Sequence, residues 1–293
     1  MTSSPRHRLG RNTDGVLSLL PPPGDLAPWV FGFVQRDDTH GGRVVVVLPE
    51  TRASIQVMVG DDYWLREQSI NTWRTVPRAG LWGPRYNWAY GFAARKIKVF
   101  AVGLTPDGAK ALTGLRATNL LNAVLPAERV SPIDFSVVAG DSFETWRVRI
   151  TGALRRHFRG VGRDNIAWDE ALHVLATSAG GAIREAAAPT GLSERQFRRL
   201  FRDRYGVSPK RYQRVLRVDR LLRQLHPAPW EADALIDDPI AFADQPHVIR
   251  EFKAMTGMTP MSYVRRKAAE NDRVVRSVAA NGVAPPAAAT LRA

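Results

Sequence analysis

The sequence predicts an α+β protein, in which a β-rich domain of barrel-like or sandwich-like form is followed by an all-α domain. Short β-branched runs broken by glycine and proline fill the first hundred residues, whereas apolar spacings of three and four dominate the second half. In addition, the pattern F-x4-G-x-[ST]-P-x-x-Y occurs at Phe201–Tyr212 and again at Phe252–Tyr263. Because the pattern recurs after 51 residues, we expect one helical unit to be used twice.

The β-rich part extends from Leu17 to about Gly103. The segments that we expect to form strands are Val44–Leu48, Ile55–Val59, Trp73–Val76 and Lys96–Val102. Five of the eight tryptophans also lie in this part, and such side chains either line a pocket or fill a core. Core filling is the commoner role of the two.

Helical signals then replace the strand signals. Thr105 precedes Pro106 as the N-cap of a short helix, and apolar residues at helical spacing predict an amphipathic helix over Asp141–Phe158. We place the domain boundary in the Gly- and Arg-rich segment Arg159–Asn165. The predicted parts are therefore a disordered basic arm (1–15), a β-rich domain ending in helices (16–160), a helical domain (166–267) and a disordered tail (268–293).

The charge of the chain predicts a polyanionic partner. The chain has 42 Lys and Arg against 28 Asp and Glu, which gives a formal net charge of +14. Over half of this excess lies in Arg184–His226, which holds twelve basic and four acidic residues. Double-stranded DNA is the first candidate. There is no cysteine, no secretory signal and no apolar stretch long enough to span a membrane, so we expect a soluble, cytoplasmic protein.

The segment around Gly191 predicts a helix-turn-helix. A small-residue helix, Ala182–Ala188, is followed by a glycine turn, by Ser193 as N-cap and by a second helix that ends at Gly206. The second helix separates its faces. Its apolar residues are Phe197, Leu200, Phe201 and Tyr205, and its basic residues are Arg195, Arg198, Arg199 and Arg202. Four guanidinium groups within two turns repel one another, which favours an anionic partner over a merely solvated face.

The second copy of the repeat predicts a second module. Lys210–Leu225 is expected to form one long helix that joins the two modules. After the break at His226–Pro229, Trp230–Ile240 supplies supporting helices, and Asp244 is the N-cap of a second recognition helix, Gln245–Met255.

Over about Ala167–Arg266, these residues resemble the AraC/XylS family of transcription regulators. The segments that carry the resemblance are GLSERQFRRLFRDRYGVSPKRY and FADQPHVIREFKAMTGMTPMSY. The resemblance implies two helix-turn-helix modules whose recognition helices enter successive major grooves of DNA. Carried over by position, the base-facing residues are Arg195, Arg198 and Arg199 in the first module and Gln245, Pro246, Ile249 and Arg250 in the second. We expect phosphate contacts from Arg202, Lys210, Arg211 and Arg214.

The second module departs from the family pattern. Pro246 and Ile249 cannot hydrogen-bond a base edge through their side chains, although Ile249 is able to touch a thymine methyl. Asp237 and Ala241 stand where the family usually has a small residue and a glycine. We therefore expect the first module to dominate sequence reading.

The N-terminal half more weakly resembles a β-rich domain that is fused to some regulators of this family, where it senses a small molecule or mediates dimerisation. A small-molecule effector, a second copy of the chain and RNA polymerase are thus further candidate partners, and the sequence leaves activation and repression equally open. Two alternatives remain: a non-specific architectural DNA-binding protein, and an enzyme with an unrecognised site in the β-rich domain. No nucleotide-binding, catalytic or metal-binding motif occurs, so we predict no catalytic residues, no metal and no cofactor.

Overall fold

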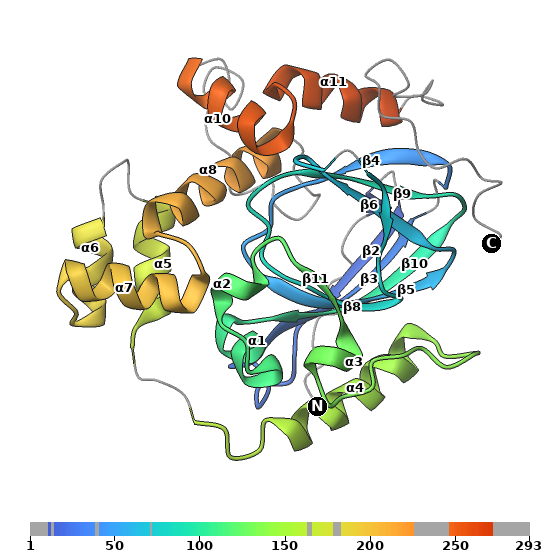
Figure 1. Cartoon of the computed structure of the whole chain (residues 1–293), viewed down its shortest axis with the longest axis horizontal. Helices are drawn as coiled ribbons and strands as arrows, with labels where there is room; N and C mark the ends of the chain where they lie inside the picture. Colours follow the sequence, from blue (N-terminus) through green and yellow to red (C-terminus); the bar gives the residue numbers. More distant parts are fainter. Residues whose placement is uncertain are drawn as a thin grey trace, which may run out of the picture.

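The computed structural model describes residues 11–12, 15–38, 41–70, 72–162, 166–177, 183–225 and 246–271. The N-terminal part contains two antiparallel sheets, and the C-terminal part is helical (Figure 1). The strands are β1 (Arg11–Asn12), β2 (Gly15–Leu20), β3 (Val30–Asp38), β4 (Arg43–Val47), β5 (Ala53–Gly60), β6 (Tyr63–Glu67), β7 (Arg74–Thr75), β8 (Ala79–Trp82), β9 (Ala89–Ala93), β10 (Ile97–Leu104) and β11 (Val124–Pro126).

The strands form a seven-stranded sheet of order β1-β2-β3-β10-β5-β8-β11 and a four-stranded sheet of order β4-β9-β6-β7. The two sheets do not close into a barrel, so the sandwich-like form of the prediction is the one confirmed. The inner side chains of the sandwich include Tyr63 and Leu65 from the small sheet and Val99 and Ala101 from the large one. The four predicted strand segments correspond to β4, β5, β7 and β10.

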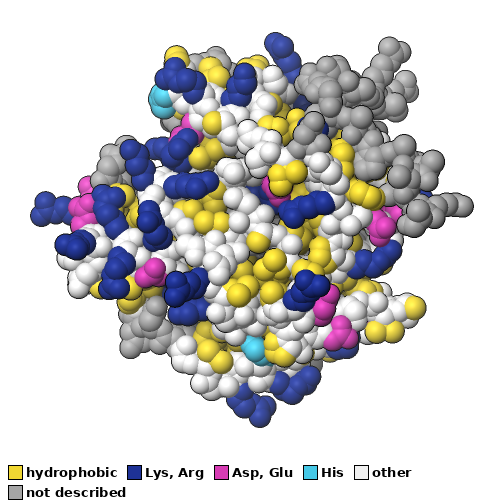
Figure 2. Space-filling model, viewed as in Figure 1, with side chains coloured by type: hydrophobic (Ala, Val, Ile, Leu, Met, Phe, Trp, Pro, Cys, Tyr) yellow, Lys and Arg dark blue, Asp and Glu magenta, His cyan; other side chains and the backbone are white. Residues whose placement is uncertain are grey.

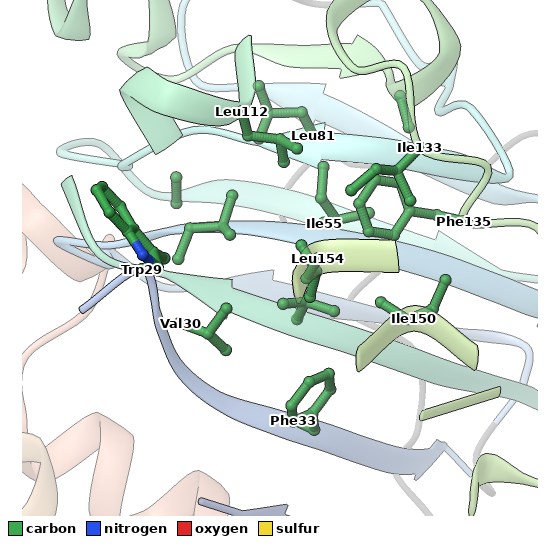
Figure 3. Close-up of a cluster of buried hydrophobic side chains, with 14 of the residues drawn as sticks. Trp29, Val30, Phe33, Ile55, Leu81, Leu112, Ile133, Phe135, Ile150 and Leu154 are labelled. Carbon is green, nitrogen blue, oxygen red and sulfur yellow. The ribbon is translucent and has the colours of Figure 1, made fainter. Parts of the chain in front are cut away.

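The other face of the large sheet is covered by α4 (Phe143–His157), whose side chains pack on those of β3 and β5 (Figure 3). This helix is the predicted amphipathic one. Ser142 caps it by accepting a hydrogen bond from the backbone N–H of Thr145 at 3.0 Å. Trp146 is fully buried, and its indole N–H donates to the carbonyl of Phe135 at 2.9 Å, so the polar atom of this large side chain is satisfied.

Three short helices precede α4, and the remaining helices build the C-terminal part. Thr105 caps the first of the three short helices, Pro106–Thr113, as predicted, and its hydroxyl accepts a hydrogen bond from the backbone N–H of Gly108 at 3.0 Å. The helices are α1 (Pro106–Thr113), α2 (Ala117–Leu120), α3 (Ala127–Val130), α5 (Trp168–Thr177), α6 (Ile183–Ala187), the 3-10 turn η1 (Ala188–Thr190), α7 (Glu194–Tyr205), α8 (Pro209–Leu225), α10 (Pro246–Thr256) and α11 (Pro260–Asn271). Within the described ranges no helix is both long and apolar enough to cross a membrane.

The repeat has the same geometry in both copies. Gly206 and Gly257 end α7 and α10 with the same φ of 77°, a left-handed conformation that glycine adopts without strain. Their backbone N–H groups donate to Arg202 and Lys253 at 2.8 Å and 2.9 Å. In each copy the phenylalanine ring then meets the tyrosine ring edge-on, with centroids 5.4 Å apart in the first copy and 6.0 Å in the second. The repeated residues therefore define one folded unit, used twice.

Candidate DNA-binding interface

The first recognition helix, α7, begins with a complete capping box. The Ser193 hydroxyl accepts from the backbone N–H of Gln196 at 3.4 Å, and the Gln196 side chain accepts from the backbone N–H of Ser193 at 3.1 Å. One side of the helix is fixed by aromatic packing, because Phe197, Phe201 and Tyr205 are buried against Trp168 of α5. Because the aromatic side of α7 is packed in the core, the opposite side of the helix is held in one orientation toward solvent.

The outward side of α7 carries the four arginines predicted to bind DNA. Arg195, Arg198, Arg199 and Arg202 are all exposed. In the space-filling view, dark-blue side chains gather over α7 and the neighbouring part of α8 (Figure 2). This arrangement presents cationic, hydrogen-bond-donating groups to solvent on a rigid helix, as a major-groove reading helix requires.

One of these arginines is partly neutralised within the helix. The guanidinium of Arg198 donates to the carboxylate of Glu194, one turn earlier, at 2.9 Å and 2.6 Å. The mutual repulsion expected from the sequence is therefore reduced, because a helix pair of this spacing attracts. Both side chains are about half exposed, so the pair is weak and can exchange for a contact with DNA.

The predicted phosphate-contacting residues of α8 occupy three different environments. Lys210 is exposed, and the guanidinium of Arg211 lies over the ring of Tyr86 in the N-terminal part, 5.4 Å from its centroid. Arg214 instead donates to Glu251 of α10 at 2.6 Å, and Arg217 donates to the same carboxylate at 3.1 Å. Glu251 thus ties the second recognition helix to the joining helix, a pairing that sequence reasoning missed.

The second recognition helix, α10, offers fewer polar groups. Val248, Phe252 and Met255 are buried, as the repeat predicts for the core side. Pro246 and Arg250 are exposed and Ile249 is half-buried. Gln245, Asp244 and the supporting segment Trp230–Ile240 lie outside the described residues.

The N-terminal part contacts the C-terminal end of α7 through an ion pair. The guanidinium of Arg204 donates twice to the carboxylate of Asp107 in α1, at 2.5 Å and 2.6 Å, and both side chains are largely buried. Arg204 also lies 5.2 Å from the ring centroid of Trp168. The spacing of Arg204 in the sequence distinguishes it from the four outward arginines. It stands three residues after Phe201 and seven after Phe197, on the apolar side.

The two repeat glycines also lie against the N-terminal part. A Cβ added at Gly206 would fall 2.8 Å from the carbonyl oxygen of Ala117, and one added at Gly257 would fall 2.8 Å from the indole ring of Trp88. In both modules, the glycine of the repeat therefore ends a helix and also lies in close contact with the N-terminal part. Neither contact touches the exposed arginine side of α7.

No group of His, Cys, Asp or Glu side chains that could bind a metal ion occurs in the ranges that the structure describes. The roles predicted for individual residues, as base-contacting or phosphate-contacting, stay predictions.

Comparison with known proteins gives one sequence match. Residues 186–266 match a family described as a helix-turn-helix domain. This match supports DNA binding and transcription regulation, and no curated protein matches the chain.

Among solved structures, ToxT from Vibrio cholerae is similar to this chain at 9% identity, over 80% of this chain and 98% of that one, with a TM-score of 0.43. ToxT with a bound unsaturated fatty acid gives 10% identity, 79% and 94% coverage and a TM-score of 0.43. Ectoine synthase from P. lautus gives 8% identity, 48% and 96% coverage and a TM-score of 0.24. At these values, the structural similarities assign no ligand or activity to this chain.

Proposed function

We propose that this chain is an AraC-type regulator of transcription that binds a specific DNA sequence and reads it mainly with α7. The match of residues 186–266 to a helix-turn-helix domain family supports this proposal. The observation that carries this proposal is the division of α7 into a buried aromatic side and an exposed arginine side. An arginine on such a helix donates two hydrogen bonds to the O6 and N7 atoms of guanine, and this geometry discriminates one base pair from the others.

The second module is proposed to position the duplex more than to read it. Pro246 has no side-chain donor, Ile249 is half-buried, and Glu251 is held by two arginines of α8. Arg250 is the exposed residue of α10 that is able to contact a guanine or a phosphate. These features of α10 also fit a second candidate function, that of a non-specific architectural DNA-binding protein.

The first experiment selects bound duplexes from a random library with the full chain and then measures affinity against excess random competitor at fixed salt. We expect a defined sequence to emerge and to resist the competitor. Arg199→Ala should weaken binding by about 1–3 kcal/mol, roughly 5- to 150-fold, and relax the preference at one base pair. Arg129→Ala removes the same charge from an exposed position on α3 and should leave specificity unchanged.

Loss of affinity for all sequences to the same degree in Arg199→Ala would favour the architectural candidate. A stronger effect of Arg250→Ala than of Arg199→Ala would contradict the assignment of reading to the first module.

The N-terminal domain is proposed to modulate DNA binding, either through a small molecule or through pairing of two chains. Its close contacts with both modules, at Gly206 and Gly257, support a mechanical link between the two halves. Dimerisation is tested by sedimentation of the full chain with and without selected DNA. A contact with RNA polymerase is tested by transcription in vitro from a promoter that carries the selected site.

A further inference from the structure

A cavity of about 190 Å³, partly open to solvent, lies in the N-terminal domain on the side of the large sheet that faces the small one. Val34 of β3 and Val99 and Ala101 of β10 form its apolar wall. An apolar cavity of about 150 Å³ is large enough to hold benzene, so this one accommodates one ring or a short alkyl chain together with a small polar group. It is too small for most drug-sized ligands, whose pockets are about 300 Å³ or more.

A stack of three residues forms one side of the cavity. Gly103 has no side chain, and a Cβ there would lie 2.1 Å from the ring of Phe31, so the glycine makes the room in which this ring lies. The guanidinium of Arg52 lies over the same ring, 4.5 Å from its centroid. All three residues line the cavity. The ring therefore holds a cation at the cavity without neutralising it.

The charged groups at the cavity favour an anion. Arg36 and Arg52 both line it, against one carboxylate, that of Glu50. The Glu50 carboxylate accepts from the backbone N–H of Arg52 at 3.1 Å. Among the described residues, no carboxylate lies within 4.0 Å of either guanidinium. Burial raises the pKa of the Glu50 carboxyl, and attraction to Arg52 only partly offsets this rise, so Glu50 competes weakly for the cation. A planar guanidinium matches a carboxylate with two parallel hydrogen bonds.

The chain segment that borders the cavity also contacts α8, through Thr51. Leu48 packs against the core of the C-terminal domain, and Glu50 exchanges two backbone hydrogen bonds with Arg85 at 2.9 Å and 2.7 Å. Burial raises the pKa of the Tyr212 hydroxyl on α8, and a hydrogen bond with the Thr51 side chain partly offsets this effect. Thr51 lies directly between Glu50 and Arg52, so one short piece of backbone borders both the cavity and the helix that joins the two modules.

We propose that this cavity binds a small monocarboxylate with an aromatic or short aliphatic body, that Arg52 pairs with its carboxylate, and that the Thr51–Tyr212 contact transmits binding to α8. The ligand site stands on the cavity itself, whereas the transmission rests on the proposed function. A ligand shifts an equilibrium only by binding one state better than the other. When Arg52 turns from the Phe31 ring to a ligand, the neighbouring Thr51 changes its contact with Tyr212, and this difference supplies the coupling.

Ligand binding is tested by thermal unfolding of the full chain with phenylacetate and hexanoate, using phenylacetamide and hexanamide as uncharged counterparts. At about ten times the dissociation constant, we expect the acids to raise Tm by roughly 3–6 °C and the amides to raise it much less. Arg52→Gln should remove the preference for acid over amide. Lys98→Gln is the matched control, because it removes one charge from the same strand as Val99, at an exposed position that does not line the cavity.

Absence of stabilisation by either acid at millimolar concentrations would overturn the ligand class. So would an unchanged acid preference in Arg52→Gln, or loss of that preference in Lys98→Gln.

Transmission is tested by the affinity of the full chain for its selected duplex with and without the acid. We expect about a fivefold change or more, the lower end of usual allosteric coupling. Tyr212→Phe keeps the buried ring but loses the hydroxyl, so it should retain the rise in Tm and lose the change in affinity. If Tyr212→Phe keeps the full change, the route through Thr51 is wrong. If no duplex is selected at all, the proposed function fails while the thermal test of the cavity still stands.

Discussion

The ion pair between Asp107 and Arg204 allows a quantitative test of how the two halves of the molecule hold together. The side chains are 17% and 14% exposed, and they share two short hydrogen bonds. Breaking a fully buried pair by removing one partner costs about 3–5 kcal/mol, because the remaining charge is left uncompensated. Arg204 keeps its contact with the Trp168 ring and has some access to water, so we expect Asp107→Asn to cost about 2–3 kcal/mol.

A double-mutant cycle with Asp107→Asn and Arg204→Gln separates this interaction from other effects of each change. Urea unfolding followed by tryptophan emission is a suitable assay, because Trp168 lies beside Arg204. We expect a coupling energy of about 1–2 kcal/mol. The exposed pair of Asp25 and Arg155 also has two hydrogen bonds, at 2.7 Å and 3.0 Å, and its own cycle should give a much smaller coupling. A coupling below about 0.5 kcal/mol for Asp107 and Arg204 would refute the reasoning.

Three further changes test the recognition helices. Gly257→Ala should lower the free energy of unfolding by about 1–2 kcal/mol because of the positive φ, and by a further amount because the new Cβ would meet the Trp88 indole ring. Gly191 has a φ of 68° but free space around it, so Gly191→Ala should show only the cost of the positive φ in urea unfolding. Glu194→Gln should raise affinity for DNA of any sequence in titrations at low salt, because it releases Arg198 and removes an exposed negative charge from the start of α7; weaker binding would contradict this. Ser193→Ala should lower the free energy of unfolding by about 1 kcal/mol through loss of the cap, and an unchanged urea midpoint would show that the cap is dispensable.

The recognition helices could be predicted because their signals are local. Ser193 and Gly206 act on backbone groups within one turn, so their residue types alone define where α7 begins and ends. The aromatic side of α7 follows from spacing alone. Phe197, Phe201 and Tyr205 are buried as the spacing predicts, whereas Leu200 on the same side is half-buried.

Contacts between distant segments could not be predicted in the same way. Asp107 is 97 residues from Arg204, and Glu251 is 37 residues from Arg214, so no spacing rule connects them. The sequence predicts Arg214 as a phosphate contact, but no local pattern indicates that its guanidinium also donates to Glu251 of α10. Strand order is hidden for the same reason, since β10 lies between β3 and β5 in the sheet although many residues separate them in the chain.

The placement of Gly206 and Gly257 limits how this protein can be re-engineered. Each glycine fits a surface of one particular β domain, at Ala117 in one case and at Trp88 in the other. A chimera that joins the helical half to an unrelated sensor would have to reproduce both surfaces at the correct separation. We therefore expect simple domain swaps at residues 159–165 to yield proteins that fold but no longer transmit a signal. Transmission should return only when the surfaces that contact Gly206 and Gly257 are rebuilt on the new domain.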